Sequence, residues 1–247
     1  ALSTVAAGQP GATGPAAGLR ELEGRLSGLG DRNVLVLRSP FYMENLLAGL
    51  PLIKAKGVNA SAIDGDLELP MIATRDVAAE VAERLARRDF SGHQVKQLVG
   101  PEDVSLRAAT RALGERLGLP GVGYVQFPAA DVQGALMGFG MSEAGASAMV
   151  ELQLGLNRHG GFASVRDTAD ATTATRLADF LEEDYPGTPV ATIPAVRAMA
   201  LGEHRSGEAR GIDDFVAVRL GDTVTVATMA GGRLSAGGSG RAGEIGH

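Results

Sequence analysis

Apolar and polar residues along this chain follow two spacings in turn. The segment 34–37 is uninterruptedly apolar and of strand length, which is typical of a parallel sheet covered on both faces. The leucines of segment 19–29 recur every three or four residues and predict a helix with one apolar face. Segments of these two kinds alternate to about residue 184, which indicates an α/β layered fold. The predicted strands or extended segments are 1–7, 34–37, 69–72, 94–99 and 124–127, and the predicted helices are 19–29, 43–56, 77–87, 106–117, 131–139, 142–156 and 175–183.

Residues that commonly begin or end helices stand at several of these boundaries. Gly57 is placed to end the helix 43–56, because glycine adopts the left-handed conformation of a C-cap without strain. Thr74 and Ser105 are predicted N-caps, since a hydroxyl oxygen there can accept a free backbone N–H of the first turn. Gly140 is predicted to separate the last long pair of helices.

The pattern changes after Pro186 and Gly187. One helix is predicted at 196–203, followed by strands at 214–220 and 224–229 that are joined by short turns. Closely spaced strands with glycine turns favour antiparallel hairpins. We therefore predict two domains, residues 1–186 and residues 187–247, the second of them small and rich in β-structure.

Composition narrows the classes of function. The 247 residues carry a formal net charge of -6, and the Lys and Arg residues form no run longer than two, so nothing indicates nucleic-acid binding. No apolar stretch reaches the ~18 residues that a membrane-crossing helix needs. The chain has no cysteine, which excludes disulfides and zinc–thiolate sites and fits a cytoplasmic location. His93 and His159 have no neighbouring ligand at metal-binding spacing, so no metal site is predicted.

Blocks of residues in the first domain resemble the NmrA-like branch of the short-chain dehydrogenase/reductase superfamily. They come in the family's order, at 2–5, 37–45, 69–78, 100–105 and 124–128. The resemblance implies an incomplete Rossmann-like doubly wound sheet with an NmrA-type C-terminal subdomain, and NAD(P)H as the cofactor. The family's glycine-rich pyrophosphate turn would precede Ala1. The segment 8–14 has a similar glycine spacing, but it contains Pro10 and opens no apolar helix, so we interpret it as a loop.

The resemblance also suggests residues that contact the cofactor. Ser3, at the end of a predicted strand, would face the nicotinamide ring, or it would only satisfy local backbone groups. Pro40, Phe41 and Tyr42 follow a strand at the edge where open α/β sheets bind ligands, although the aromatic rings would also suit packing under the next helix. Asn45 is either a further ligand-binding residue or part of a helix surface.

No catalytic residue is predicted. Active dehydrogenases of this superfamily use a Tyr-x-x-x-Lys pair for proton transfer. The helix that should carry the pair has neither Tyr nor Lys in segment 18–25. The resemblance then implies a redox-sensing binding module or an NAD(P)H-dependent reductase of quinone-like acceptors, with impaired cofactor binding in the chain as it stands.

The second domain resembles an internal part of ROK-family sugar kinases and repressors at 197–204, 211–221 and 240–247. This resemblance implies that Glu244 and His247 contact sugar hydroxyls. Pro194 and Ala195 stand where the family has its Asn-Asp pair with the catalytic base, so sugar kinase activity is not expected. The alternatives are therefore a ROK-type sugar-binding or kinase-derived module, or an inactive fusion remnant.

Overall fold

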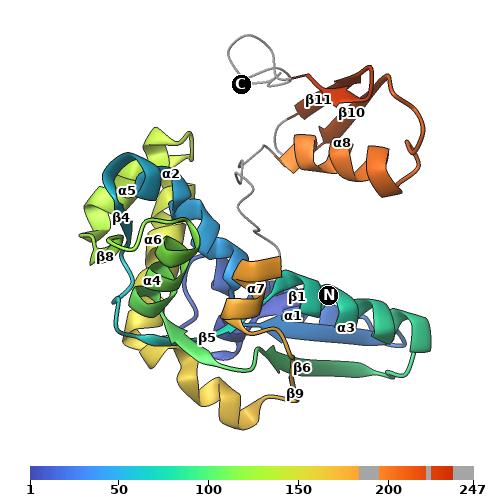
Figure 1. Cartoon of the computed structure of the whole chain (residues 1–247). Helices are drawn as coiled ribbons and strands as arrows, with labels where there is room; N and C mark the ends of the chain where they lie inside the picture. Colours follow the sequence, from blue (N-terminus) through green and yellow to red (C-terminus); the bar gives the residue numbers. More distant parts are fainter. Residues whose placement is uncertain (184–194, 221–223, 236–247) are drawn as a thin grey trace. The chain divides into compact units, whose positions relative to one another are not determined.

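The computed structural model describes residues 1–183, 195–220 and 224–235. The chain divides into two compact units, Ala1–Val190 and Ala191–His247 (Figure 1). Each unit is described by itself. The assignment of residues 1–186 and 187–247 to two different families stays a prediction.

A parallel sheet forms the centre of the first unit. Its strand order is β1-β2-β6-β9, and each neighbouring pair is parallel. The strands are β1 (Leu2–Thr4), β2 (Val34–Ser39), β6 (His93–Val99) and β9 (Ala171–Thr172). Helix α3 (Thr74–Arg87) covers one face, where Leu35, Leu37 and Leu98 pack against Val77. Helices η1 (Val5–Gly8), α1 (Pro15–Ser27) and η3 (Gly160–Thr168) cover the other, so the predicted α/β doubly wound architecture is confirmed.

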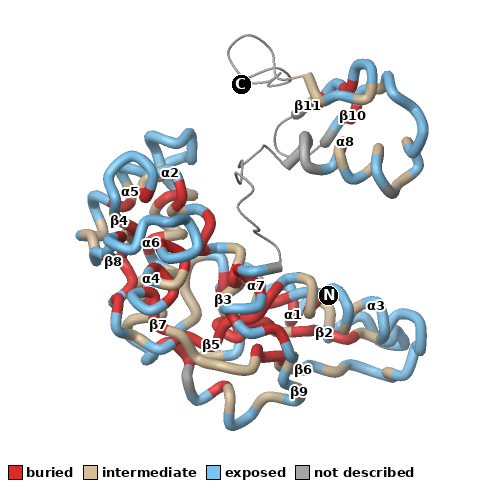
Figure 2. Tube along the Cα trace, in the orientation of Figure 1, coloured by how far each residue is buried: buried red, intermediate tan, exposed pale blue. Residues whose placement is uncertain are grey.

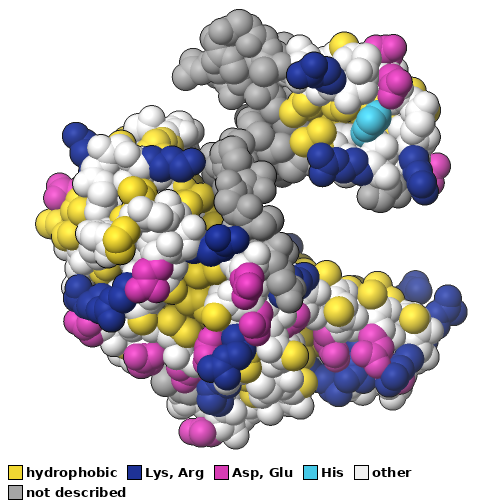
Figure 3. Space-filling view, viewed as in Figure 1, with side chains coloured by type: hydrophobic (Ala, Val, Ile, Leu, Met, Phe, Trp, Pro, Cys, Tyr) yellow, Lys and Arg dark blue, Asp and Glu magenta, His cyan; other side chains and the backbone are white. Residues whose placement is uncertain are grey.

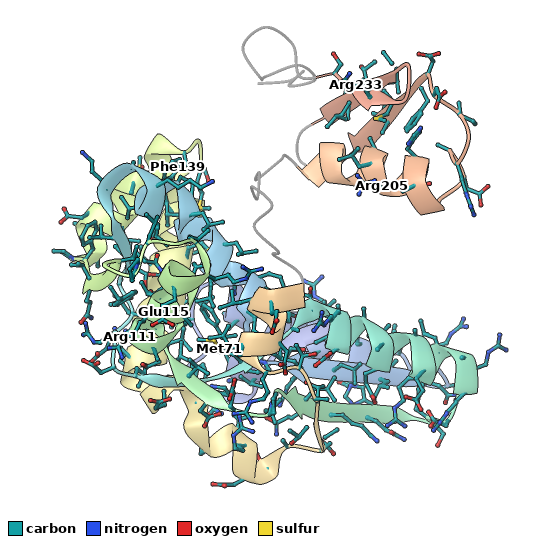
Figure 4. All side chains as sticks on the ribbon, in the orientation of Figure 1. Met71, Arg111, Glu115, Phe139, Arg205 and Arg233 are labelled. Atoms are coloured by element: carbon teal, nitrogen blue, oxygen red, sulfur yellow. The ribbon has the colours of Figure 1, made fainter. Side chains whose placement is uncertain are left out.

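A second layer of short strands and helices lies beyond the carboxyl ends of the sheet. Strand β5 lies between β3, which is parallel to it, and β7, which is antiparallel, while β4 pairs with β8 in parallel. These elements enclose the largest apolar cluster, which contains Met71 (Figures 2 and 4). Phe139, at the turn after α5, is instead 83% exposed. The elements are β3 (Phe41–Tyr42), η2 (Met43–Gly49), α2 (Leu50–Lys56), β4 (Val58–Ser61), β5 (Glu68–Ile72), β7 (Asp103–Ser105), α4 (Leu106–Arg116), β8 (Gly123–Gln126), α5 (Ala129–Gly138), α6 (Glu143–Arg158) and α7 (Leu177–Glu183).

Most predicted helix boundaries agree with the structure. Gly57 ends α2 in the left-handed conformation with φ +68°, and Gly140, with φ +92°, separates α5 from α6. Ser105 accepts a hydrogen bond from the backbone N–H of Ala108 at 3.2 Å, as expected of an N-cap. The predicted helix 43–56 is divided into a 3₁₀ segment, η2, and the α-helix α2.

Three predictions at the sequence level are wrong. Thr74 is the first residue of α3 and not its cap; the carboxylate of Glu44 accepts the Thr74 N–H at 2.9 Å instead. The predicted strand 1–7 turns into the 3₁₀ helix η1 at Val5. The leucine stripe of α1 does not face the sheet, since Leu22 and Leu29 are exposed and the buried residues of α1 are Ala16 and Glu23.

The second unit is a small antiparallel sheet covered by one helix. Its elements are α8 (Ala195–Ser206), β10 (Phe215–Leu220), β11 (Val224–Ala230) and β12 (Arg233–Leu234), with strand order β10-β11-β12. The predicted hairpin is confirmed, because β10 pairs with β11 in antiparallel register from Phe215–Met229 to Leu220–Val224. Ala200 of α8 packs on Ala217, Ala227 and Met229 of the sheet.

Candidate functional site

A groove of about 190 Å³ lies at the carboxyl ends of β1 and β2. Open α/β sheets bind ligands at this edge, because the strand ends leave room there for loops and bound molecules. Parallel pairing places Ser3 beside Arg38 and Thr4 beside Ser39. The lining residues are Leu2, Ser3, Thr4, Leu19, Ser39, Pro40 and Tyr42.

The groove contains part of the predicted cofactor-contacting set. Ser3, Pro40 and Tyr42 line it together. Phe41 does not; it packs, partly buried, against the large apolar cluster of the second layer. Asn45 is exposed on η2 and is not among the lining residues. The contact of these residues with a cofactor stays a prediction.

Ser3 is hydrogen-bonded to an ion pair between Glu23 and Arg38. Glu23 of α1 is 8% exposed, and its carboxylate accepts hydrogen bonds from Arg38 Nε at 3.0 Å and Nη2 at 2.5 Å. The Ser3 hydroxyl donates to Glu23 Oε1 at 2.5 Å. Gly8 lies against the Arg38 guanidinium, and any side chain at Gly8 would collide with it. Two neighbouring strands and the covering helix are therefore joined by one charged network.

The electrostatics of this network keep Glu23 ionised. Burial by itself would raise the pKa of the Glu23 carboxyl group, because it removes water from the charged form. The hydrogen bonds from Arg38 and Ser3, together with the positive charges of Arg38 and Arg20, oppose this, and the net result is a lowered pKa. At neutral pH Glu23 is thus an acceptor with no proton to give.

Ser39 also lines the groove, but its hydroxyl differs from that of Ser3 in its hydrogen bonding. The residue is 1% exposed, and its Oγ has no hydrogen-bond partner in the part of the chain that the structure describes. Buried hydroxyls are rarely left unpaired, since each lost partner costs about 1–3 kcal/mol. Thr4 differs again, because its Oγ1 already accepts the Ala6 N–H at 3.4 Å. Ser39 therefore has a buried hydroxyl for which the described part of the chain supplies no partner.

The glycine segment 8–14 does not form a phosphate cradle. The space beside Gly14 is occupied by the backbone carbonyl of Ala148 in α6. Arg20 Nε donates to the carbonyl of Ala7 at 2.7 Å, and Arg20 Nη2 donates to that of Gln9. Phosphate binding needs free backbone N–H groups converging on one point. This segment instead packs against α6 at Gly14, and its Gln9 carbonyl accepts a hydrogen bond from Arg20.

Sequence reasoning missed Glu23, Arg38 and Ser39. Arg38 and Ser39 directly follow the apolar run 34–37, and polar residues at the end of a buried strand are a usable signal for a site. Glu23 had no such signal, because a glutamate among leucines on a helix normally faces water.

Outside the groove, the Tyr124 hydroxyl forms a structural hydrogen bond in the first unit. Burial raises the pKa of Tyr124, and its hydroxyl donates to the carbonyl of Ile63 at 2.7 Å.

Among the residues described, no three His, Cys, Asp or Glu side chains are arranged to hold a metal ion. None of the described helices is long and apolar enough to cross a membrane. Glu244 and His247, the predicted sugar-contacting residues, lie outside the described residues.

The fold of the first unit is similar to that of an NADPH-dependent quinone oxidoreductase and of a nucleoside-diphosphate-sugar epimerase. An NADPH-dependent quinone oxidoreductase from Escherichia coli matches with TM-score 0.61 and 24% identity over 74% of this chain. Its complex with NADPH matches with TM-score 0.60 and 25% identity over 74% of this chain. A nucleoside-diphosphate-sugar epimerase from Staphylococcus aureus matches with TM-score 0.54 and 19% identity over 74% of this chain and 63% of its own. The predicted likeness to NAD(P)-binding proteins of this fold is confirmed.

The present chain spans only 66% and 64% of the two oxidoreductase chains. The ROK family model matches residues 162–247, so the predicted ROK resemblance is confirmed as well. That match begins within η3 and therefore includes the end of the first unit. The comparison with curated proteins returns no match.

Proposed function

We propose that the first unit is the nicotinamide-binding part of an NAD(P)H-linked protein. The observation that carries this proposal is the groove at the carboxyl ends of β1 and β2, on a fold shared with an NADPH-dependent quinone oxidoreductase. The protein then acts as a redox-sensing module or as a reductase of quinone-like acceptors.

The lining residues fit a nicotinamide ring. Leu2, Leu19, Pro40 and Tyr42 offer apolar surface to a flat ring, and Ser3 offers a hydroxyl oxygen to its carboxamide. A bound NAD(P)H supplies a hydride. The residues of this chain bind and orient the ring, and no Tyr-x-x-x-Lys pair is present in α1 to transfer a proton.

We further propose that the chain as it stands binds the whole dinucleotide weakly. Charge-assisted contacts to phosphate are worth about 1.5–3 kcal/mol each, and the segment 8–14 makes no cradle for them. The dissociation constant for NADPH should then be about millimolar or weaker. Calorimetry with NADPH measures it, and a micromolar constant would contradict this part of the proposal.

A titration with 1-methylnicotinamide, which lacks the phosphates, tests the groove itself. Amide resonances of Ser3, Ser39 and Tyr42 should shift in NMR spectra of the ¹⁵N-labelled full chain. Leu19→Trp should abolish the shifts by filling the groove. Leu22→Trp is the matched control, because Leu22 lies on the same helix and is exposed outside the groove. Shifts that spread over the whole unit, or that survive Leu19→Trp, would place the nicotinamide elsewhere.

The ROK match favours a second candidate function for the second unit, a sugar-binding or kinase-derived module that uses Glu244 and His247. The other reading is an inactive fusion remnant. Calorimetry with glucose separates them: millimolar or tighter binding that Glu244→Ala removes supports the module, and no binding supports the remnant.

The charges on the face of the first unit that Figure 3 draws add little to the nicotinamide proposal. On the face of the first unit drawn in Figure 3, acidic and basic side chains are interspersed, and no broad area of one sign is seen. Small-molecule recognition at the groove therefore carries the functional argument.

A further inference from the structure

We propose that Glu23 and Arg38 are positioning residues that make Ser3 a hydrogen-bond acceptor toward the molecule in the groove, so that the groove selects a ligand group that donates. The inference rests on the proposed function and extends it to the chemistry that the groove recognises. Neither residue lines the groove; both act through Ser3.

The direction of the Ser3 hydrogen bond is fixed by proton counting. A serine hydroxyl has one proton and two lone pairs. Glu23 is ionised and also receives two N–H bonds from Arg38, so it can only accept. The 2.5 Å contact between Ser3 Oγ and Glu23 Oε1 therefore uses the only Ser3 proton. What remains at Ser3 is its lone pairs.

The network is built to hold this arrangement. Arg38 occupies both carboxylate oxygens, which prevents the Glu23 side chain from rotating away from Ser3. Arg38 is itself confined against the backbone at Gly8. Charge-assisted hydrogen bonds in a buried place are stronger than those between neutral groups, so a ligand cannot easily reclaim the Ser3 proton.

Ser3 then requires a donor from a ligand. A primary carboxamide carries such a donor in its N–H group, and so it can satisfy Ser3. A methyl ketone of the same size offers only the acceptor and leaves Ser3 unsatisfied, which is costly at a desolvated site.

The test compares two ring cations that differ in this group alone, 1-methylnicotinamide and 3-acetyl-1-methylpyridinium. NMR titrations of the full chain give both dissociation constants. The wild type should bind the carboxamide about tenfold more tightly, the usual effect of one unmatched buried hydrogen bond. Glu23→Ala frees the Ser3 hydroxyl to donate to the acetyl group, so the ratio of the two constants should fall to about one to two.

The ratio separates positioning from folding. General loosening of the unit would weaken both probes and leave their ratio unchanged. Glu21→Ala is the matched control on the same helix, since its carboxylate pairs with the exposed Arg25, and it should keep the wild-type ratio. If Glu23→Ala does not fold, Ser3→Ala serves instead, because it removes the acceptor and leaves the ion pair in place.

Each outcome decides something. Equal binding of both probes by the wild type, or a tenfold ratio that survives either Glu23→Ala or Ser3→Ala, overturns this inference and leaves the proposed nicotinamide site standing. Binding of neither probe overturns the proposed function and this inference with it. A ratio lost in Glu23→Ala and Ser3→Ala, and retained in Glu21→Ala, supports the positioning role.

Discussion

Replacing Arg38 by methionine should destabilise the first unit in a way that depends on pH. The variant keeps the length of the side chain and removes its charge, which leaves the Glu23 carboxyl group buried with Ser3 as its remaining hydrogen-bond donor. Removing one partner of a buried ion pair commonly costs about 3–5 kcal/mol. The Arg38 side chain is 20% exposed and that of Glu23 10%, so some water reaches the orphaned group, and we expect about 3 kcal/mol at pH 7.

The pH dependence follows from the direction of the pKa shift. In the wild type the pKa of Glu23 is lowered, so its stabilising effect is present above the unfolded-state pKa of about 4.3 and is lost as the pH falls through the folded-state value. In Arg38→Met, burial is no longer offset by the arginine, so the pKa is raised and the carboxyl group takes up a proton instead. Protonation costs about 1.4 kcal/mol per pH unit above the ordinary pKa, which limits the penalty at pH 7 and removes it near pH 4. The loss of stability should therefore shrink to about 1 kcal/mol at pH 4.

Urea unfolding followed by tyrosine fluorescence measures this loss. The chain has 3 tyrosines and none of them lies in segment 191–247, so the second unit contributes no tyrosine signal. Arg25→Met is the control, because Arg25 and Glu21 form an ion pair on the same helix with side chains 76% and 65% exposed. Exposed pairs contribute at most about 1 kcal/mol. A loss for Arg38→Met no larger than that for Arg25→Met, or one equal at pH 7 and pH 4, would refute the reasoning.

Further predictions concern the backbone, the unit boundary and the second unit. Gly14→Ala should destabilise the first unit by more than about 2 kcal/mol in urea unfolding, since φ is +55° and α6 fills the space, whereas Gly18→Ala within α1 should stabilise it by about 0.5–1 kcal/mol. Trypsin should cleave the full chain first near Arg210, which is exposed between α8 and β10; mass spectrometry showing first cuts at 75–88 would contradict a boundary near residue 186. A coupled assay with glucose and ATP should show no phosphorylation, and turnover that Glu244→Ala abolishes would prove this wrong.

The architecture was predictable where the determining signal is local. The apolar run 34–37 identifies a buried strand without reference to the rest of the chain, and β2 extends over it. Gly57 and Ser105 act on the helix next to them, so their roles follow from residue type and position.

The site was predictable only in part, because its polar contacts join residues far apart in the sequence. Ser3 and Tyr42 were expected from strand ends, but the carboxylate behind Ser3 comes from α1, 20 residues away. The cap of α3 fails for the same reason, since Glu44 reaches Thr74 across 30 residues. The apolar periodicity of α1 also predicts the wrong buried face. It places Glu23 on the surface, whereas Glu23 is buried because it forms an ion pair with Arg38.

This inward glutamate also bears on the choice between the proposed functions. Reduction of a quinone consumes a proton with each hydride, and the dehydrogenases that the sequence resembles take it from a Tyr-x-x-x-Lys pair. In this chain α1 presents Glu23, which is ionised at neutral pH and has no proton to deliver. The Ser3 proton is already engaged by Glu23, so among the lining residues the hydroxyls of Thr4, Ser39 and Tyr42 remain. Sensing the redox state of a bound nicotinamide needs recognition alone, and the network that fixes Ser3 supplies recognition. A reductase would have to draw its proton from Tyr42 or from water in the groove. Loss of quinone reduction in Tyr42→Phe with unchanged binding of 1-methylnicotinamide would therefore favour the enzyme over the sensor.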